Sequence, residues 1–184
     1  MKKLIQLVFL LTCAFASKAQ VTYLDVHEKV STYPKVEWVR GTPVTQFDKN
    51  KIYIIELWAT WCKPCIKSMP HMNQLYTKYK DRIEFIGQDV WEDDIEKVKQ
   101  FLVDNKDIIS YPIAYAGKRE ESDFEKNWIK PSGTVGIPRT FIVQNNTIMW
   151  ITNPFSLYEE HLQLLLENKF TEEAAEAIVK KHKL

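Results

Sequence analysis

The chain has 184 residues, of which 45% are hydrophobic, and this length suits one compact domain with a sizeable core. Its 25 basic and 24 acidic side chains give a formal net charge of +1. This near balance removes the electrostatic reason to expect nucleic acid or an anionic membrane surface as a partner.

The first nineteen residues have the pattern of an export signal. Lys2 and Lys3 precede a mostly apolar stretch over residues 4–16, and Ser17-Lys18-Ala19 supplies small residues ahead of a cleavage site before Gln20. The apolar stretch is shorter than the roughly 20 residues that a membrane-spanning helix needs. We therefore predict an exported, periplasmic protein. Two alternatives tether it to the membrane, through an uncleaved signal or through a lipid on Cys13.

After cleavage the chain keeps two cysteines, Cys62 and Cys65. An exported protein sits in an oxidising compartment, where disulfides persist. A domain stapled by disulfides carries more cysteines, and a pair this close closes too short a loop to constrain the unfolded chain much. The pair therefore indicates chemistry more than stapling.

The early elements have clear patterns. Residues 20–35 are polar and predict a flexible, irregular lead-in, with the domain over residues 36–184. The continuous β-rich run at residues 51–58 predicts a strand buried on both faces. A helix is expected to begin at Cys62, because Pro64 is tolerated in a first turn and apolar residues then recur at spacings of three and four.

Further along, residues 82–90 and 109–116 predict strands, with an amphipathic helix at 94–105 between them. Residues 117–134 are charged and rich in turn formers, with Phe124 and Trp128 as expected anchors. Asn145-Asn146 predicts a hairpin between strands at 140–144 and 147–152, because asparagine tolerates positive φ. Helices are expected at 156–168 and after Thr171. This order predicts an α/β fold with a mixed central sheet and helices on both faces.

The position of the cysteines predicts an asymmetric pair. A thiol at a helix N-terminus faces unpaired N–H groups and the positive end of the helix dipole, and such thiols titrate at roughly 3.5–7.5. We expect Cys62 to be exposed and ionised, and Cys65 to be shielded one turn further in. Cys62 then attacks a disulfide of another molecule, and Cys65 resolves the mixed disulfide.

Glu56 lies in the apolar strand six residues before Cys62. Burial disfavours the charged form of an acid, so we expect a raised pKa that suits proton transfer near neutral pH. The alternative is that Glu56 points outward at a sheet edge. A further alternative concerns the cysteines themselves, which could bind zinc, but structural zinc takes four ligands and the four histidines have no matching spacing. No metal and no cofactor are expected.

Two motifs together resemble the thioredoxin superfamily, in particular its exported TlpA/ResA-type thiol–disulfide oxidoreductases. The first is E-L-W-A-T-W-C-K-P-C at residues 56–65, followed by Met69-Pro70, and the second is V-G-I-P-R-T-F at residues 135–141. The resemblance covers about residues 36–168. It implies a three-layer α/β/α fold in which a βαβ unit is followed by a β-hairpin and a C-terminal helix.

The resemblance also implies roles for particular residues. Cys62 is the implied nucleophile, Cys65 the resolving thiol, and Pro138 a cis proline opposite the pair. Ile137 is expected to offer backbone groups to an extended substrate segment. Trp61 is expected to pack, and to shape the contact surface beside Cys62.

The chain departs from two branches of this superfamily. Some cytochrome-maturation members carry a glutamate where this chain has Ser68, which weakens an apocytochrome-specific role. No P-x-x-x-T-x-x-C segment precedes the nucleophile, which argues against the peroxidase branch.

These observations predict an enzyme that reduces disulfides of exported client proteins and is recharged by a membrane thiol electron donor. The redox-active Cys62–Cys65 disulfide replaces a cofactor in this hypothesis. Three alternatives stay open: a thiol oxidant, a binding module or chaperone for extended segments, and a metal carrier.

Overall fold

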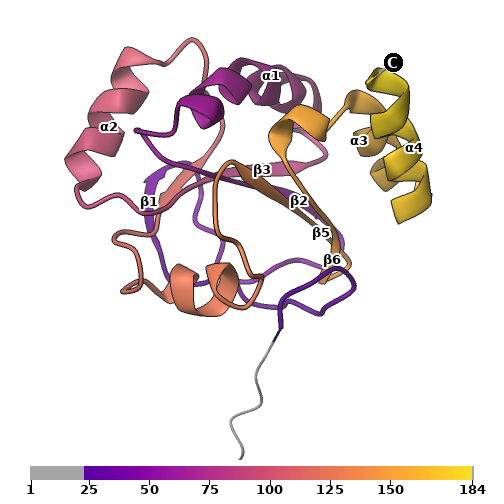
Figure 1. The fold of residues 1–184 in the computed structure, drawn as a ribbon, viewed down its shortest axis with the longest axis horizontal. Helices are drawn as coiled ribbons and strands as arrows, with labels where there is room; N and C mark the ends of the chain where they lie inside the picture. The colour runs from indigo at the N-terminus through magenta and orange to yellow at the C-terminus, as the bar shows by residue number, and fades with distance from the viewer. Residues whose placement is uncertain (1–22, 184) are drawn as a thin grey trace, which may run out of the picture.

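The computed structural model describes residues 23–183 (Figure 1). The expected export signal at residues 1–19, with Cys13, lies outside the described residues. Among residues 23–183, no helix is both long and apolar enough to cross a bilayer. One sheet contains β1 (Glu37–Arg40), β2 (Ile52–Trp58), β3 (Glu84–Asp89), β4 (Ile113–Tyr115), β5 (Arg139–Gln144) and β6 (Thr147–Thr152).

The strand order is β1-β4-β3-β2-β5-β6, so β2 is central. β2 and β4 run parallel to β3, whereas β1 pairs antiparallel with β4, and β5 pairs antiparallel with both β2 and β6. The expected mixed sheet is confirmed. The strand β1 was not predicted, and the expected strand at 109–116 is shorter than its sequence pattern indicated.

Within residues 23–183, four α-helices accompany the sheet: α1 (Lys63–Tyr79), α2 (Ile95–Asp104), α3 (Glu159–Leu166) and α4 (Glu172–His182). The helix α1 connects β2 to β3, which makes the expected βαβ unit. The caps also agree with the sequence, because Thr171 accepts a hydrogen bond from the N–H of Ala174 and Asp94 caps α2. Asn145 and Asn146 turn the β5–β6 hairpin with φ values of 53° and 55°.

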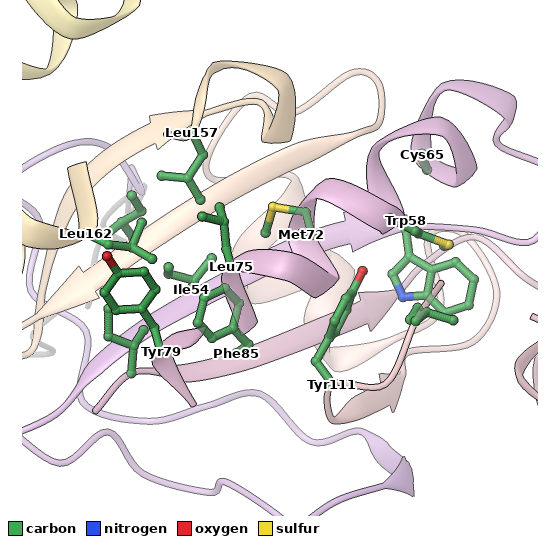
Figure 2. Close-up of a cluster of buried hydrophobic side chains, with 14 of the residues drawn as sticks. Ile54, Trp58, Cys65, Met72, Leu75, Tyr79, Phe85, Tyr111, Leu157 and Leu162 are labelled. Carbon is green, nitrogen blue, oxygen red and sulfur yellow. The ribbon is translucent and has the colours of Figure 1, made fainter. Parts of the chain in front are cut away.

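The two faces of the sheet are covered differently. Along β2, Ile54 and Trp58 point into a cluster that includes buried residues from all four α-helices. Figure 2 shows part of this cluster, in which Met72 and Leu75 of α1 lie over the sheet. We call this the helix face.

The alternate residues of β2, such as Ile55, point into a second cluster that we call the aromatic face. A π-helical turn, η1 (Glu125–Ile129), and residues 24–47 cover it. Phe124 and Trp128 are buried there, as expected from the sequence. Helices are thus found on both faces, as expected, with a short helical segment at residues 123–129 on this one. Aromatic side chains from irregular segments complete this third layer.

The lead-in also differs from its prediction. The N–H of His27 donates to the carbonyl of Ile148 at 2.8 Å, and that of Val30 donates to Asn146 at 2.9 Å. Tyr33 is 4% exposed and lies in the aromatic-face cluster. Residues 24–33 therefore pack on the hairpin, and their few apolar side chains cover part of the aromatic face. This corrects the expectation of a flexible segment.

Candidate active site

The cysteine pair lies where β2 ends and α1 begins. Cys62 is the N-cap of α1, its Sγ accepts a hydrogen bond from the N–H of Cys65 at 3.3 Å, and Pro64 lies in the first turn. A disulfide joins Cys62 to Cys65, with 5.2 Å between their Cα atoms. The expected helix start is thus confirmed, and both sulfurs lie at the positive end of the helix dipole.

The expected difference in exposure is not found in this oxidised state. Cys62 is 3% exposed and Cys65 is 0% exposed. Both belong to the helix-face cluster, against which Ile137 also packs. The disulfide holds the outer sulfur over the first turn of the helix, close to apolar neighbours, so the prediction of an exposed Cys62 is wrong for the disulfide form.

Glu56 is buried in the middle of β2, at 1% exposure, and the alternative of an outward-facing edge residue is excluded. Its Oε2 accepts a hydrogen bond from the Tyr111 hydroxyl at 2.7 Å. Its Oε1 lies 3.0 Å from the hydroxyl of Ser68, which is also 2.7 Å from the carbonyl of Cys65. The Ser68 side chain therefore connects the buried Glu56 to the backbone of Cys65.

The Ser68 hydroxyl can serve either protonation state of Glu56, because it donates to the charged carboxylate or accepts from the protonated acid. A serine hydroxyl has one hydrogen, so Ser68 cannot donate fully to both Glu56 and the carbonyl of Cys65. When Glu56 carries a proton on Oε1, it donates to Ser68, and Ser68 donates to Cys65. All three groups are then satisfied.

The pKa of Glu56 is raised to about 7, chiefly because burial penalises the charged carboxylate. The hydrogen bonds from Tyr111 and Ser68 lower the pKa and so limit this rise. The sequence predicted both the burial and the direction of the shift. A carboxyl group with this pKa exchanges its proton readily near neutral pH.

A second buried acid, Asp89, ends β3 beside the end of β2. It is 0% exposed, and neither of its carboxylate oxygens has a hydrogen-bond partner among residues 23–183. Burial raises the pKa of Asp89 well above its usual value, and the nearby charge of Glu92 raises it further.

The loop after β3 braces the turn that precedes the disulfide. Glu92 Oε2 accepts hydrogen bonds from the hydroxyl and the N–H of Thr60, at 2.5 Å and 3.3 Å. The indole N–H of Trp61 donates to the carbonyl of Trp91 at 3.2 Å. These bonds fix the backbone that presents Cys62 and leave the indole of Trp61, which is 55% exposed, beside it.

The second motif lies in the loop before β5, where the Ile137–Pro138 peptide bond is cis. Within the described part of the chain, the N–H and carbonyl of Ile137 have no hydrogen-bond partner, and its side chain packs on the cluster that contains both cysteines. Ile137 and Trp61 also line one cavity. The structure thus brings the two sequence motifs together.

Sequence reasoning missed several residues of this site. Tyr111 gave no signal, because it lies 55 positions from Glu56 and contacts it only through the parallel register of the sheet. Ser68 was noted only as a departure from other proteins. Trp91 and Glu92 lie between the expected strand at 82–90 and the expected helix at 94–105, and no sequence pattern singled them out. No group of three or more histidine, cysteine, aspartate or glutamate side chains within residues 23–183 is placed to hold a metal ion.

The sheet order, the disulfide at the start of α1 and the neighbouring cis-proline loop define a thioredoxin-fold protein with a C-x-x-C disulfide. The chain belongs to the AhpC/TSA family, whose model matches residues 35–151.

Relatives and solved structures agree with this assignment. A thiol-disulfide oxidoreductase ResA from Bacillus thuringiensis is 38% identical over 99 residues, which cover 53% of this chain and 51% of that protein. The chain thus matches about half the length of this relative. The fold of this chain is similar to that of the thioredoxin domain of a thiol-disulfide oxidoreductase from Bacteroides vulgatus, with a TM-score of 0.62 and 18% identity. The match covers 77% of this chain and 99% of that one. A thiol-disulfide isomerase from Corynebacterium glutamicum has a TM-score of 0.56 and 20% identity, over 84% and 97% of the two chains.

Proposed function

We propose that this protein is a thiol–disulfide oxidoreductase that reduces disulfides in exported client proteins through Cys62 and Cys65. The observation that carries the proposal is the placement of the pair at the start of α1, with Glu56 connected behind Cys65 through Ser68. The names of its relatives support the same reaction class.

The reaction starts from the reduced protein, which holds two thiols. The thiolate of Cys62 attacks one sulfur of the client disulfide, a new S–S bond forms, and the other client sulfur leaves as a thiolate and takes up a proton. Cys65 then gives its proton to the Glu56 carboxylate and attacks the sulfur of Cys62. The second client sulfur leaves and is protonated. The client gains two electrons and two protons, and the protein ends as the disulfide.

A membrane thiol electron donor restores the dithiol in this proposal, after export of the protein to the periplasm. Lys63 adds a positive charge next to Cys62, which favours its thiolate over the thiol. Ile137 and Pro138 border the pair, and the free backbone groups of Ile137 suit pairing with an extended client segment. Trp61 supplies an exposed apolar surface for the same segment.

The test is to trap the mixed disulfide. A Cys65→Ala variant is reduced and mixed with a disulfide-bonded protein substrate, and the adduct is mapped by mass spectrometry. We expect a stable adduct on Cys62 that the Cys62→Ser, Cys65→Ala double variant does not form. Equal adduct formation by the double variant would contradict the proposal.

The direction of electron flow is tested by the reduction potential of the pair. A value near that of thioredoxin, about −270 mV, supports a reductant, whereas one near about −120 mV supports the alternative of a thiol oxidant. The alternative of a chaperone or binding module predicts that a Cys62→Ser, Cys65→Ser variant keeps full biological activity. The oxidoreductase proposal predicts loss of that activity.

Hydrogen peroxide is tested as an alternative substrate of the same protein, because the chain belongs to the AhpC/TSA family. A peroxide also oxidises a thiol pair to the disulfide, so the rates with hydrogen peroxide and with a client disulfide are compared directly. We expect the client disulfide to react faster at equal concentration. A faster reaction with peroxide would favour the peroxidase branch.

A further inference from the structure

An open cavity of about 440 Å³ lies beside the cysteine pair. Its lining includes Trp61, which precedes Cys62, and Ile137, which precedes the cis proline. Trp91 and Arg119 also line it. Its size falls within the range of about 300–1,000 Å³ that is common for ligand sites. The cavity is therefore continuous with the surface where the proposed reaction occurs.

The wall at Trp91 is held in an unusual conformation. Trp91 has a φ of 60°, a region that costs a bulky residue free energy and is uncommon outside functional sites. Three contacts hold it there. Its indole N–H donates to Glu125 at 2.7 Å, its carbonyl accepts from Trp61, and the guanidinium of Arg119 lies 4.1 Å from its ring centroid.

The partners of Trp91 are themselves irregular. Glu125 is 4% exposed and begins the π-helical turn η1, a type of turn that is frequent at functional sites. Arg119 has no carboxylate within 4.0 Å in the described part of the chain, and it lines the cavity together with Asp93. Val135 also lines the cavity, and it is 88% exposed.

We propose that this cavity binds an aromatic side chain of the client, placed one or two residues from the client cysteine that Cys62 attacks. This inference rests on the proposed function and names its substrate preference. Adjacent Cα atoms are 3.8 Å apart, and an extended segment advances about 3.3 Å per residue, so a side chain at this distance from the cysteine reaches the cavity beside Trp61.

The chemistry of the walls favours an aromatic ring over an aliphatic chain. Two indoles offer edges and faces to a third ring, and aromatic pairs gain energy beyond the area that they bury. The guanidinium of Arg119 adds a cation that attracts the face of a ring. A client segment whose backbone pairs with Ile137 holds the ring in place at the same time.

The test uses short peptides with blocked ends, joined as symmetric disulfides through one cysteine. The residue next to the cysteine, or two positions from it, is Phe, Leu or Ala. The second-order rate constant for oxidation of the reduced protein is measured by stopped-flow tryptophan fluorescence. We expect the best Phe peptide to react about tenfold faster than its Ala counterpart, with Leu between them.

Two variants test whether the cavity causes the preference. Trp91→Gly removes the indole wall, and glycine tolerates the positive φ. Val135→Ser changes a side chain too exposed for the fold to depend on it. Both are expected to reduce the preference, measured as the ratio of the Phe and Ala rates within each variant, to about twofold or less. Phe155→Ala, which removes an exposed aromatic residue away from the cavity, is the control and keeps the full preference.

The outcomes separate the two proposals. Equal wild-type rates with all peptides, or a preference that survives Trp91→Gly, overturn the aromatic site and leave the oxidoreductase proposal intact. If Trp91→Gly does not fold, Val135→Ser decides in the same way. If no peptide disulfide oxidises the reduced protein, the proposed function fails and this inference fails with it.

Discussion

The two faces of the central sheet are built on different principles. The helix face is covered by regular helices whose apolar residues recur with helical spacing, and it contains Glu56 and Cys65. The aromatic face is covered by residues 24–47 and the π-helical turn, in which large rings do most of the packing. Tyr33 and Phe47 lie 5.7 Å apart between ring centroids, and Phe124 and Trp128 lie 5.5 Å apart.

This difference separates two tasks within one small domain. The helix face places the groups that handle protons and sulfur, because the N-terminus of α1 lies directly over the end of β2. The aromatic face fixes largely irregular backbone, and its π-helical turn carries Glu125, which holds Trp91. Substitutions on the aromatic face should mainly lower the stability of the fold. Substitutions on the helix face should mainly alter the rate and pH dependence of the reaction.

The largest expected effect is on stability, at Trp128. This residue is 2% exposed and contacts rings of Phe124 and Phe141, so Trp128→Ala is expected to lower the free energy of unfolding by about 3–5 kcal/mol. Urea unfolding of the oxidised protein measures this. The rate of thiol–disulfide exchange by the Trp128→Ala molecules that stay folded should change little.

The control for Trp128 is Val103→Ala on α2, where the side chain is 67% exposed. It is expected to change the free energy of unfolding by no more than about 0.5 kcal/mol. A loss below about 1 kcal/mol in Trp128→Ala would show that the aromatic face is not a true core, and the contrast between the faces would fail.

The next effect is the pH dependence of stability that Glu56 causes. Its folded-state pKa of about 7 lies above the usual 4.5, so the folded protein binds this proton more tightly than the unfolded chain does. Stability therefore falls as pH rises from about 4.5 to about 7, by about 3 kcal/mol, and the loss then levels off. Urea unfolding of wild type and Glu56→Gln across this range isolates the difference. A wild-type protein that gains stability relative to the variant as pH rises would contradict the shift.

The effect of Glu56 on the rate of client release is somewhat smaller than its effect on stability. In Glu56→Gln the side chain cannot accept the proton of Cys65, so release of the client from the mixed disulfide is expected to slow by about 100-fold at pH 7. Attack by Cys62 should change much less. Single-turnover kinetics separate the two steps, and equal slowing of both would indicate a structural effect instead of proton transfer.

The smallest predicted effect is a shift of the pH profile. Tyr111 and Ser68 lower the pKa of Glu56 through their hydrogen bonds, so Tyr111→Phe and Ser68→Ala should both move the midpoint of the release step to higher pH. The shift should be larger for Tyr111→Phe. Tyr115→Phe, whose hydroxyl donates to the carbonyl of Glu92, is the matched control and should leave the midpoint in place. A downward shift in Tyr111→Phe would contradict the assignment.

The sequence predicted the helix face better than the aromatic face for a physical reason. Helical spacing in α1 and the apolar run of β2 are local patterns, and they located the cysteine pair and Glu56. The hairpin followed from Asn145-Asn146, whose side chains tolerate positive φ.

The segments that cover the aromatic face have no such regular spacing of apolar residues. Leu24, Val30 and Tyr33 are isolated apolar residues in a polar segment, and only the sheet that they cover makes them part of the core. Positive φ at Trp91 could not be inferred either, because tryptophan disfavours it and three tertiary contacts impose it. The burial of Cys62 in the disulfide form could not be inferred either, because it depends on packing by residues distant in the sequence.

The central claim is that the thiol of Cys62, once reduced, is held as a thiolate by the N-terminus of α1. The most direct measurement is the rate of alkylation by iodoacetamide against pH in reduced Cys65→Ala, in which Cys62 is the reactive thiol of the described domain. We predict a midpoint below about 7.5, compared with about 8.5 for a free cysteine. A midpoint at or above 8.5 would contradict the account.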